Sequence, residues 1–363
     1  MAHVAIIGTR GYPSYYGGFE TAVRFLGEFL VEKDWDVTIY GRPESGEGNH
    51  KADPRIEVKF TRGWDKKATS TLSYGMTASI DAVRLKPDVA LVMNVANGYW
   101  LPLLKARGIP TLVNVDGVEW ERAKWNRAAR AVFRVGGRLT ARFADEIVVD
   151  AEAIGDRWQE WYGRPGVYIP YGSLEVPKRP APFGLPQGSY VLFVARFVPE
   201  NSVDEFFEAS RKIARDVPVV IVGSSGYGGE LDQAAAALTS EFDSVRWLGH
   251  VRDDNLLHDL WSNCGVYFHG HTVGGTNPAL VQAMRCGAPV LARDTVFNRE
   301  VLAETGHFVD SDPGVIADAL RDLLAAPAEA RCLGEAAALR AREKFDWPSI
   351  CGDYKRALEN LLE

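Results

Sequence analysis

Short runs of apolar, β-branched residues alternate with helical patterns along the whole chain, and this alternation constrains the fold more than any other feature. The runs are nearly continuous in apolar residues, as is typical of parallel strands that are buried on both faces. Between them, apolar residues recur at helical spacing, as in residues 19–30. The expected strands are Val4–Ile7, Val37–Tyr40, Ile56–Phe60, Val89–Met93, Thr111–Val115, Ile147–Val149, Val191–Val194, Val219–Val222, Val245–Leu248, Val266–Phe268 and Pro289–Ala292. The pattern predicts an α/β protein with two parallel sheets.

The boundary between the two series of strands is marked by prolines. Residues 175–188 carry four of them and show no periodicity, so we expect a linker there. The predicted domains are therefore residues 1–174 and 189–346. A final helix is expected from about Trp347 to Leu361, because apolar residues at 350, 354, 358 and 361 form one stripe.

Composition narrows the class of protein. A chain of 363 residues with 46% hydrophobic residues supports about two packed domains and excludes global disorder. With 41 basic and 48 acidic residues the net charge is −7, which argues against a general polyanion binder. The four cysteines form no CxxC pair, and no long apolar stretch is present, so we expect a cytoplasmic protein with reduced thiols.

A glycine-rich loop, residues 8–20, separates the first strand from the first helix. It lies where ligands bind in a doubly wound sheet. Gly17 and Gly18 at the helix start would let backbone N–H groups approach an anion or a sugar, and Arg10 favours phosphate. The dinucleotide fingerprint G-x-G-x-x-G is absent, which disfavours a nicotinamide enzyme. A purely structural turn is the alternative interpretation of the glycines.

The turn around Gly275-Thr276-Asn277 is the most informative stretch. Asn277 is a good N-cap and Pro278 suits the first helical position, so a helix should begin here with free N–H groups. Such a helix start is a ready site for a diphosphate. One turn further on, Gln282 could hydrogen-bond a ribose hydroxyl.

Two histidines and an acidic pair could suggest a metal site, which we do not expect. His269 and His271 have no third ligand nearby, and a satisfied or substrate-facing role is favoured over a metal site. Asp310 and Asp312 precede Pro313-Gly314, where Asp is an ordinary helix cap. No metal and no cofactor are therefore expected.

A basic stripe is predicted in the first domain. Between Arg122 and Arg142 there are seven basic residues and no acidic one, and the stripe consists of Arg127, Arg130, Arg134, Arg138 and Arg142. A solvated helix face is the alternative, and Gly136-Gly137 weakens the helix prediction. An anionic membrane is favoured over nucleic acid as the partner, because no nucleic-acid motif accompanies the arginines.

Taken together, these stretches resemble the GT-B glycosyltransferases of the large retaining "group 1" set, and most closely the bacterial rhamnosyltransferases of cell-wall and capsular polysaccharides. The resembling stretches are 8–13, 17–20, 114–120, 195–201, 248–251 and 274–284. The resemblance implies two Rossmann-like domains facing across a cleft, with the last helix, 347–363, crossing back to the N-terminal domain. It also implies that a nucleotide-sugar binds mainly to the C-terminal domain and the acceptor to the N-terminal one.

The resemblance also implies roles for single residues. Arg196 would contact the donor diphosphate, and the backbone around His250 would hold the base. The remaining donor-binding residues would be Arg10, Gly17, Gly18, Asn201, His271, Gly275, Thr276, Asn277 and Gln282. Asp116 takes the place of the family's catalytic His and is the candidate for orienting the acceptor hydroxyl. Asp116 could also be a simple turn residue.

Three positions depart from the usual family pattern. Asn201 stands where the family has a Lys five residues after the Arg, and Gly274 and Gln282 stand where it has a pair of Glu. Asp116, Asn201 and Gly274 match the rhamnosyltransferase-like subgroup, whereas Gln282 does not. Gln282 keeps the hydrogen-bonding shape of Glu but loses its charge, which leaves the nucleotide preference open.

The predicted function is a retaining, metal-independent transfer of a sugar, rhamnose from dTDP-rhamnose, to a lipid-linked glycan acceptor. The enzyme is expected at the inner face of the plasma membrane, bound through the basic stripe. One alternative keeps the fold and uses a GDP- or UDP-hexose donor. Another, from a different class, is a catalytically silent module that binds glycan or a partner.

Overall fold

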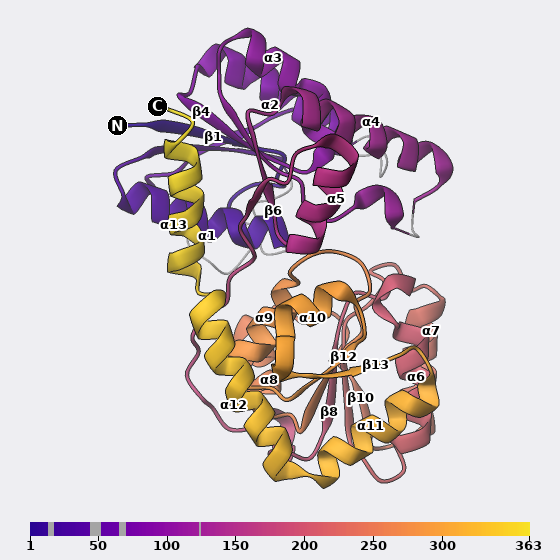
Figure 1. The fold of residues 1–363 in the computed structure, drawn as a ribbon. Coiled ribbons are helices and arrows are strands. Elements are labelled where there is room, and N and C mark those ends of the chain that lie inside the picture. Colours follow the sequence, from indigo (N-terminus) through magenta and orange to yellow (C-terminus); the bar gives the residue numbers. More distant parts are fainter. Residues whose placement is uncertain (14–17, 44–51, 65–69, 123–124) are drawn as a thin grey trace. The chain divides into compact units, whose positions relative to one another are not determined.

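The structure is a computed structural model that describes residues 1–13, 18–43, 52–64, 70–122 and 125–363 (Figure 1). The chain divides into two compact units. The first unit comprises Met1–Tyr171 and Trp347–Glu363, and the second comprises Gly172–Asp346. The proline-rich residues 175–188 belong to the second unit, where Arg179 Nη2 donates to Asn255 Oδ1 at 2.8 Å.

The first unit is built on a parallel sheet with the strand order β3-β2-β1-β4-β5-β6-β7 among the described residues. Its strands are β1 (His3–Ile7), β2 (Asp36–Gly41), β3 (Glu57–Phe60), β4 (Val89–Met93), β5 (Thr111–Asn114), β6 (Glu146–Val149) and β7 (Val167–Tyr168). Its helices are α1 (Gly18–Glu32), α2 (Ser70–Leu85), α3 (Leu101–Ala106), α4 (Arg127–Phe143), α5 (Glu152–Tyr162) and α13 (Trp347–Glu359), with short 3₁₀ turns η1 (Val95–Trp100) and η2 (Glu119–Glu121).

The second unit repeats the plan with the parallel strand order β10-β9-β8-β11-β12-β13. Its strands are β8 (Val191–Val194), β9 (Val219–Val222), β10 (Val245–Trp247), β11 (Val266–His269), β12 (Val290–Arg293) and β13 (His307–Val309). Its helices are α6 (Val203–Ile213), α7 (Glu230–Glu241), α8 (Asp254–Asn263), α9 (Pro278–Arg285), α10 (Val296–Leu302), α11 (Pro313–Ala325) and α12 (Pro327–Lys344), with 3₁₀ turns η3 (Pro182–Gly184), η4 (Pro199–Asn201) and η5 (Ala303–Thr305).

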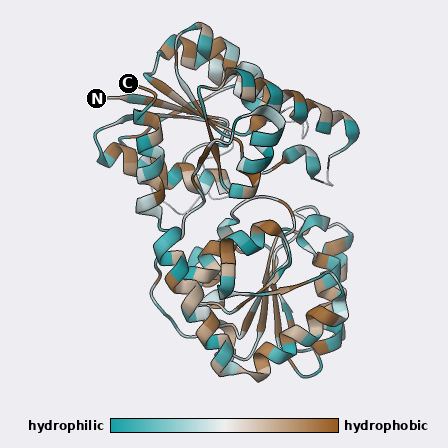
Figure 2. Ribbon diagram, in the orientation of Figure 1, coloured by the Kyte–Doolittle hydropathy of each residue, from teal (hydrophilic) through white to brown (hydrophobic). Residues whose placement is uncertain are grey.

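The sheet of the second unit is buried on both faces, as its continuous apolar runs predict. Successive side chains point to opposite faces of a strand. Phe193 packs in one core cluster with α6, α7 and α11, and Leu192 packs in another with α8, α9, α10 and α12. Figure 2 shows the same arrangement, with hydrophobic strands at the centre of the unit and hydrophilic helix surfaces outside.

The edge strands depart from the sequence prediction. β7 and β13, of two and three residues, were not predicted, because so short a stretch at a sheet edge carries no long apolar run. β3 was expected to be buried on both faces, yet its residues are exposed or half-buried, and Phe60 is 56% exposed. Helices cover the faces of a sheet less completely at its edge than at its centre. The apolar composition of an edge strand therefore does not reveal how deeply it is buried.

The C-terminal helix α13 packs in the first unit, beside α1 (Figure 1). The rings of Phe25 and Trp347 stack with centroids 4.7 Å apart, and Asn114 Nδ2 donates to Tyr354 Oη at 2.5 Å. Ile350, Tyr354 and Leu358 are buried as the stripe predicts. The helix ends at Glu359, so Leu361 lies beyond it.

Helix α4 is continuous across Gly136-Gly137, and the two glycines explain how it packs. A Cβ at Gly136 would lie 2.5 Å from Val95 O, and one at Gly137 would lie 2.9 Å from the Trp120 ring. The backbone of α4 therefore approaches η1 more closely than any side chain would permit. The glycines are a packing requirement and do not end the helix.

This packing predicts opposite effects of one substitution at two helical glycines of the first unit. Gly136→Ala is expected to destabilise the unit by about 1–3 kcal/mol, because the new methyl group overpacks the contact with Val95. Gly352→Ala in α13 has no neighbour within 4 Å and should stabilise the unit by about 0.5–1 kcal/mol. Urea unfolding followed by circular dichroism measures both. Equal effects of the two substitutions would contradict the close approach.

Candidate functional site

Each sheet has a point where the chain order reverses, and ligands of open α/β sheets bind at such points, beyond the carboxyl ends of the strands. In the second unit this point lies between β8 and β11, which pair directly. In the first unit it lies between β1 and β4. The predicted site residues of the second unit follow β8, β10 and β11, and thus lie at one edge of its sheet. We call this the carboxyl edge of the second sheet.

The loops of this edge are held together by backbone hydrogen bonds. Gly223 N donates to Gly249 O at 2.7 Å, and Phe197 N donates to Ser224 O at 3.1 Å. Thr272 N donates to Glu200 O at 2.9 Å. A Cβ at Gly223 would lie 1.8 Å from Ala195 O, so only glycine allows this approach. The edge is therefore a rigid scaffold on which side chains can be placed accurately.

Helix α9 begins as the sequence predicts. The Asn277 side chain accepts a hydrogen bond from Ala279 N at 2.9 Å, and Pro278 occupies the first helical position. Gly274 has a φ of 114°, a conformation that favours glycine. Residues 274–276 thus lead into a helix start that carries partial positive charge. The prediction of free N–H groups at this start is wrong, because the N–H groups of Ala279, Leu280 and Val281 all donate to Asn277.

Arg196 follows β8 and its side chain is exposed at the carboxyl edge. Its carbonyl oxygen accepts a hydrogen bond from Asn201 Nδ2 at 2.8 Å, and Asn201 itself is only 3% exposed. Asn201 was predicted among the donor-binding residues. In the structure its side chain binds the backbone of Arg196. His250, the residue predicted beside the base, is exposed in the loop after β10.

The two histidines form a stacked pair. The rings of His269 and His271 are nearly parallel, with centroids 4.4 Å apart, and His269 Nδ1 lies 3.0 Å from Tyr267 Oη. Burial lowers the pKa of His269 well below its usual range, so this ring is neutral. Within the described ranges, no group of three or more His, Cys, Asp and Glu side chains could hold a metal ion. Asp312 caps α11 through Gly314 N and Val315 N, as predicted.

Gln282 uses both polar atoms of its side chain within the protein. Its Oε1 accepts from Leu174 N and its Nε2 donates to Leu174 O, each at 2.9 Å. The ribose contact implied by the family resemblance stays a prediction.

In the first unit, the loop after β1 gathers groups of opposite charge. Arg10 is exposed, and its backbone N–H donates to Glu20 Oε1 at 3.2 Å. Glu20 is buried, and burial raises its pKa while Arg10 and Arg42 oppose the rise. Gly18 is the first residue of α1, whereas Gly17 lies outside the described residues.

Sequence analysis assigned no role to Glu20 or Arg42. Arg42 directly follows β2, and its guanidinium lies 5.0 Å from the centre of the Tyr74 ring. Both side chains line a small cavity together with Gly8 and Thr9. An acidic residue in the first turn after a glycine-rich loop was the available signal for Glu20. No local signal indicates Arg42, because its place follows from strand order.

Asp116 follows β5 in a left-handed conformation, with a φ of 56°. Its N–H donates to Asn114 Oδ1 at 2.9 Å, and its carboxylate lies 3.6 Å from Arg122 Nη2. A left-handed aspartate is uncommon and is found at turns and at strained functional positions. The structure does not bring Asp116 and Arg196 into the same unit.

Helix α4 presents the predicted basic stripe on its outer face. Arg127, Arg134 and Arg138 are exposed, and Arg130 is half-buried, with Nη2 donating to Arg122 O at 3.3 Å. The buried residues of the helix are small, namely Gly136, Gly137 and Thr140. Its large apolar residues are therefore only half-covered, and Val135 is 40% exposed.

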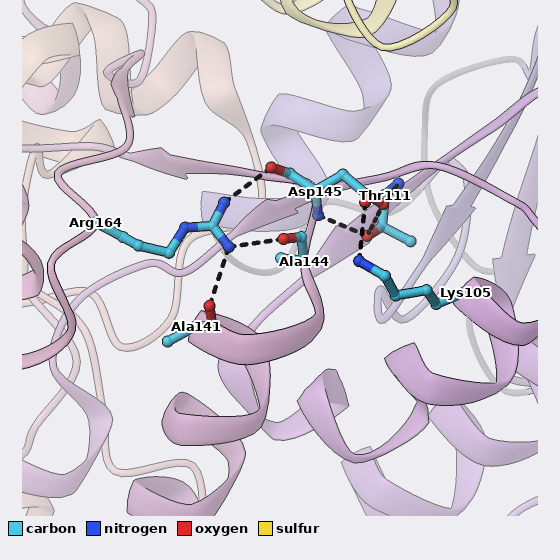
Figure 3. A network of polar contacts seen from close by, with 6 residues as sticks. All are labelled: Lys105, Thr111, Ala141, Ala144, Asp145 and Arg164. Atoms are coloured by element: carbon cyan, nitrogen blue, oxygen red, sulfur yellow. Dashed lines mark hydrogen bonds and ion pairs between the residues drawn. The ribbon is translucent and has the colours of Figure 1, made fainter.

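Arg164 fastens the end of α4 (Figure 3). Its guanidinium donates to Ala141 O, Ala144 O and Asp145 O at 2.7–3.0 Å. Asp145 in turn accepts from Thr111 N at 2.9 Å. This network holds the basic helix in a fixed position beside β5.

None of the helices in the described part of the chain is long and apolar enough to cross a membrane.

Both units match known glycosyltransferase families. Residues 188–326 match the family described as "Glycosyl transferases group 1", and residues 17–172 match the family described as "Glycosyl transferase 4-like domain".

Among curated proteins, the phosphatidyl-myo-inositol mannosyltransferase of Mycobacterium leprae is 30% identical over 233 residues. That alignment covers 60% of this chain and 60% of the mannosyltransferase. The α-maltose-1-phosphate synthase of Mycobacterium tuberculosis is 24% identical over 94% of this chain and 95% of its own length.

Solved structures show the same fold over the whole chain. Sucrose-phosphate synthase from Thermosynechococcus elongatus has a TM-score of 0.84 at 20% identity, and covers 99% of both chains. Anabaena HepE in complex with UDP has a TM-score of 0.75 at 16% identity, over 99% of this chain and 100% of its own. The fold class predicted from the sequence, GT-B, is confirmed, whereas no rhamnosyltransferase is among these relatives.

Because Asn277 caps α9, two substitutions at this position can distinguish the effect of a negative charge from the effect of losing the cap. Asn277→Asp keeps the cap, because Asp accepts the same hydrogen bond, but it places a negative charge where the sequence predicts an anion to bind. We expect unchanged thermal stability and at least tenfold weaker binding of UDP or pyrophosphate, measured by calorimetry. Asn277→Ala should instead lose about 1 kcal/mol of stability. Unchanged anion affinity in Asn277→Asp would show that no anion binds at this helix start.

Proposed function

We propose that this chain, whose two units match two glycosyltransferase families and which has the GT-B fold, transfers a sugar from a nucleoside-diphosphate donor to a lipid-linked glycan acceptor. The observation that carries the proposal is that an exposed Arg196 and the capped start of α9 follow the two strands, β8 and β11, that pair at the switch point of the second sheet.

The chemistry requires positive charge at this point. When the bond to the sugar breaks, negative charge develops on the departing diphosphate. Arg196 can make charge-assisted hydrogen bonds to it, and the partial positive charge at the start of α9 favours it. A divalent cation is not needed in this arrangement, so a chelator should leave turnover unchanged.

Asp116 is the proposed acceptor-side residue. In a retaining transfer, the acceptor hydroxyl enters on the face from which the phosphate leaves, and a phosphate oxygen can take its proton. Asp116 is held by Asn114 and Arg122, so its carboxylate has a defined position from which to orient that hydroxyl. Arg10, at the switch point of the first sheet, is the second proposed cation for the diphosphate.

The donor is the finer part of the proposal. The sequence resemblance favours dTDP-rhamnose, with a GDP- or UDP-hexose as the alternative. The alternative is supported by the names of relatives, among them a GDP-mannose-dependent phosphatidylinositol monomannoside mannosyltransferase of Mycolicibacterium smegmatis, 28% identical over 46% of this chain. A panel of dTDP-, GDP-, UDP- and ADP-sugars decides between them.

Helix α4 is the proposed membrane-facing element. An exposed one-signed stripe with half-covered apolar residues beside it is typical of a helix that lies in a membrane interface. Anionic lipid would hold the enzyme at the inner face of the membrane, where a lipid-linked acceptor is located.

The role of Arg196 predicts a loss of turnover without a loss of folding. With the donor that the panel identifies, Arg196→Ala should lower kcat by about 10²–10³, because one preorganised donor to the leaving group is lost. Arg331→Ala, an exposed arginine on α12, is the matched control and should leave kcat unchanged. A reduction below tenfold in Arg196→Ala would remove Arg196 from the mechanism. Absence of transfer and hydrolysis with every donor would support a silent binding module.

The membrane proposal predicts a charge-dependent partition onto vesicles. Each basic residue near an anionic surface contributes about 1 kcal/mol, so reversing Arg127, Arg134 and Arg138 to Glu should weaken binding at least a hundredfold. Co-sedimentation with vesicles containing anionic lipid measures this. Reversing Arg215, Arg331 and Arg342 in the second unit is the matched control. Equal binding by the two triple variants would exclude α4 as the contact surface.

A further inference from the structure

We propose that Gln282 is a positioning residue, which fastens the donor-side helix α9 to the chain segment at residues 173–175. This inference rests on the proposed function and replaces the ribose contact that the family resemblance implies for this position.

The contact is reciprocal. The Gln282 amide accepts from Leu174 N and donates to Leu174 O, both at 2.9 Å, and so pairs with one residue as a neighbouring strand would. Nε2 also lies 3.7 Å from Cys286 Sγ. Only a group that donates and accepts at the same time can satisfy both Leu174 partners. A carboxylate would place a second negative oxygen beside the Leu174 carbonyl, which explains why Gln stands where the family has Glu.

The segment bound by Gln282 lies at the boundary of the second unit. That unit begins at Gly172 and ends at Asp346. Ser173 N and Oγ both donate to Phe345 O, at 2.6 and 2.8 Å. The two points where the chain enters and leaves the unit are therefore bound to each other, and Gln282 binds this pair to α9.

Charged groups surround the contact. Arg285, on α9, lies 3.4 Å from both Glu175 and Asp346. Cys286 is buried, which raises its pKa to about 11, so it stays a neutral thiol. Asp259 of α8 also acts on Cys286 electrostatically. Arg285 thus reinforces the connection of α9 to the boundary segments, but it does not touch the Gln282 amide in these hydrogen bonds.

The consequence concerns the anion site at the start of the same helix. Gln282 lies about one turn beyond Pro278, so the clamp and the helix start are separated by roughly 6 Å along the axis, at 1.5 Å per residue. A rigid helix of this length transmits any shift at Leu174 to the helix start and to residues 274–277 that lead into it. Displacements near 1 Å can cost about a hundredfold in rate. Gln282 thereby fixes the donor-binding groups without touching the donor.

The test uses the fact that a protonated carboxyl, like an amide, donates and accepts. In Gln282→Glu the introduced carboxyl should have a pKa above the ordinary value of about 4.3, because its charged form lies half-buried beside the Leu174 carbonyl oxygen. Its folded-state pKa is raised, so the clamp forms at low pH and is lost as pH rises through that pKa. Gln282→Ala cannot form the clamp at any pH.

We expect nucleotide-free Gln282→Glu to melt below the wild type at pH 8 and to approach it at pH 5, while Gln282→Ala melts below it at both. The kcat/KM of Gln282→Glu relative to wild type should be at least tenfold lower at pH 8 and recover at pH 5. Glu175, Asp346 and Asp259 are present in the wild type and in the variants. Comparing each variant with wild type at the same pH therefore cancels the effect of their titration on stability and on kcat/KM.

Two outcomes would overturn the proposal. The first is a melting temperature of both nucleotide-free variants equal to that of the wild type at pH 8. This result would show that the Leu174 contact does not stabilise the fold, as expected if Gln282 only binds the ribose. A deficit of Gln282→Glu independent of pH would show that donation to the Leu174 carbonyl is unimportant. If the wild type transfers no sugar from any donor while the melting pattern holds, the proposed function fails and the clamp stands.

Discussion

The direct parallel pairing of β8 with β11 is the constraint on which the carboxyl edge of the second sheet depends. Because β9 and β12 lie on opposite sides of this pair, the chain leaves it in opposite directions, and the following loops do not cover each other. Arg196 and the start of α9 therefore reach the same edge from residues far apart in the sequence. Glycines at 223 and 270 let backbones approach closely enough to lock these loops together.

The chemistry of single side chains decides how this scaffold is used. Asn201 and Gln282 both depart from the usual family residues, and both amides bind backbone groups of their own unit. An amide serves this purpose because it carries a donor and an acceptor without charge, whereas a buried lysine or glutamate would need a counter-ion. In both cases the amide supports a backbone segment next to a group that we propose to bind the donor.

In the first unit, helix α4 packs through small residues. Helix α4 buries glycines and a threonine, so its backbone fits closely against η1 while its larger apolar side chains stay half-covered. An amphipathic helix of a globular core normally buries those large residues. Arg164 fixes the end of the helix through three carbonyl oxygens, which keeps the basic stripe in one orientation (Figure 3).

Sequence alone determined the features that rest on local signals, namely the strands with continuous apolar runs and the Asn277 and Asp312 caps. The GT-B fold followed from the resemblance of several such stretches to a known family. It could not determine the short edge strands β7 and β13, whose two or three residues carry no periodicity. Nor could it determine the partner of Gln282, because Leu174 lies 108 residues away. A side chain's chemistry states which bonds it can make, but only the tertiary structure decides which backbone groups come within reach of it.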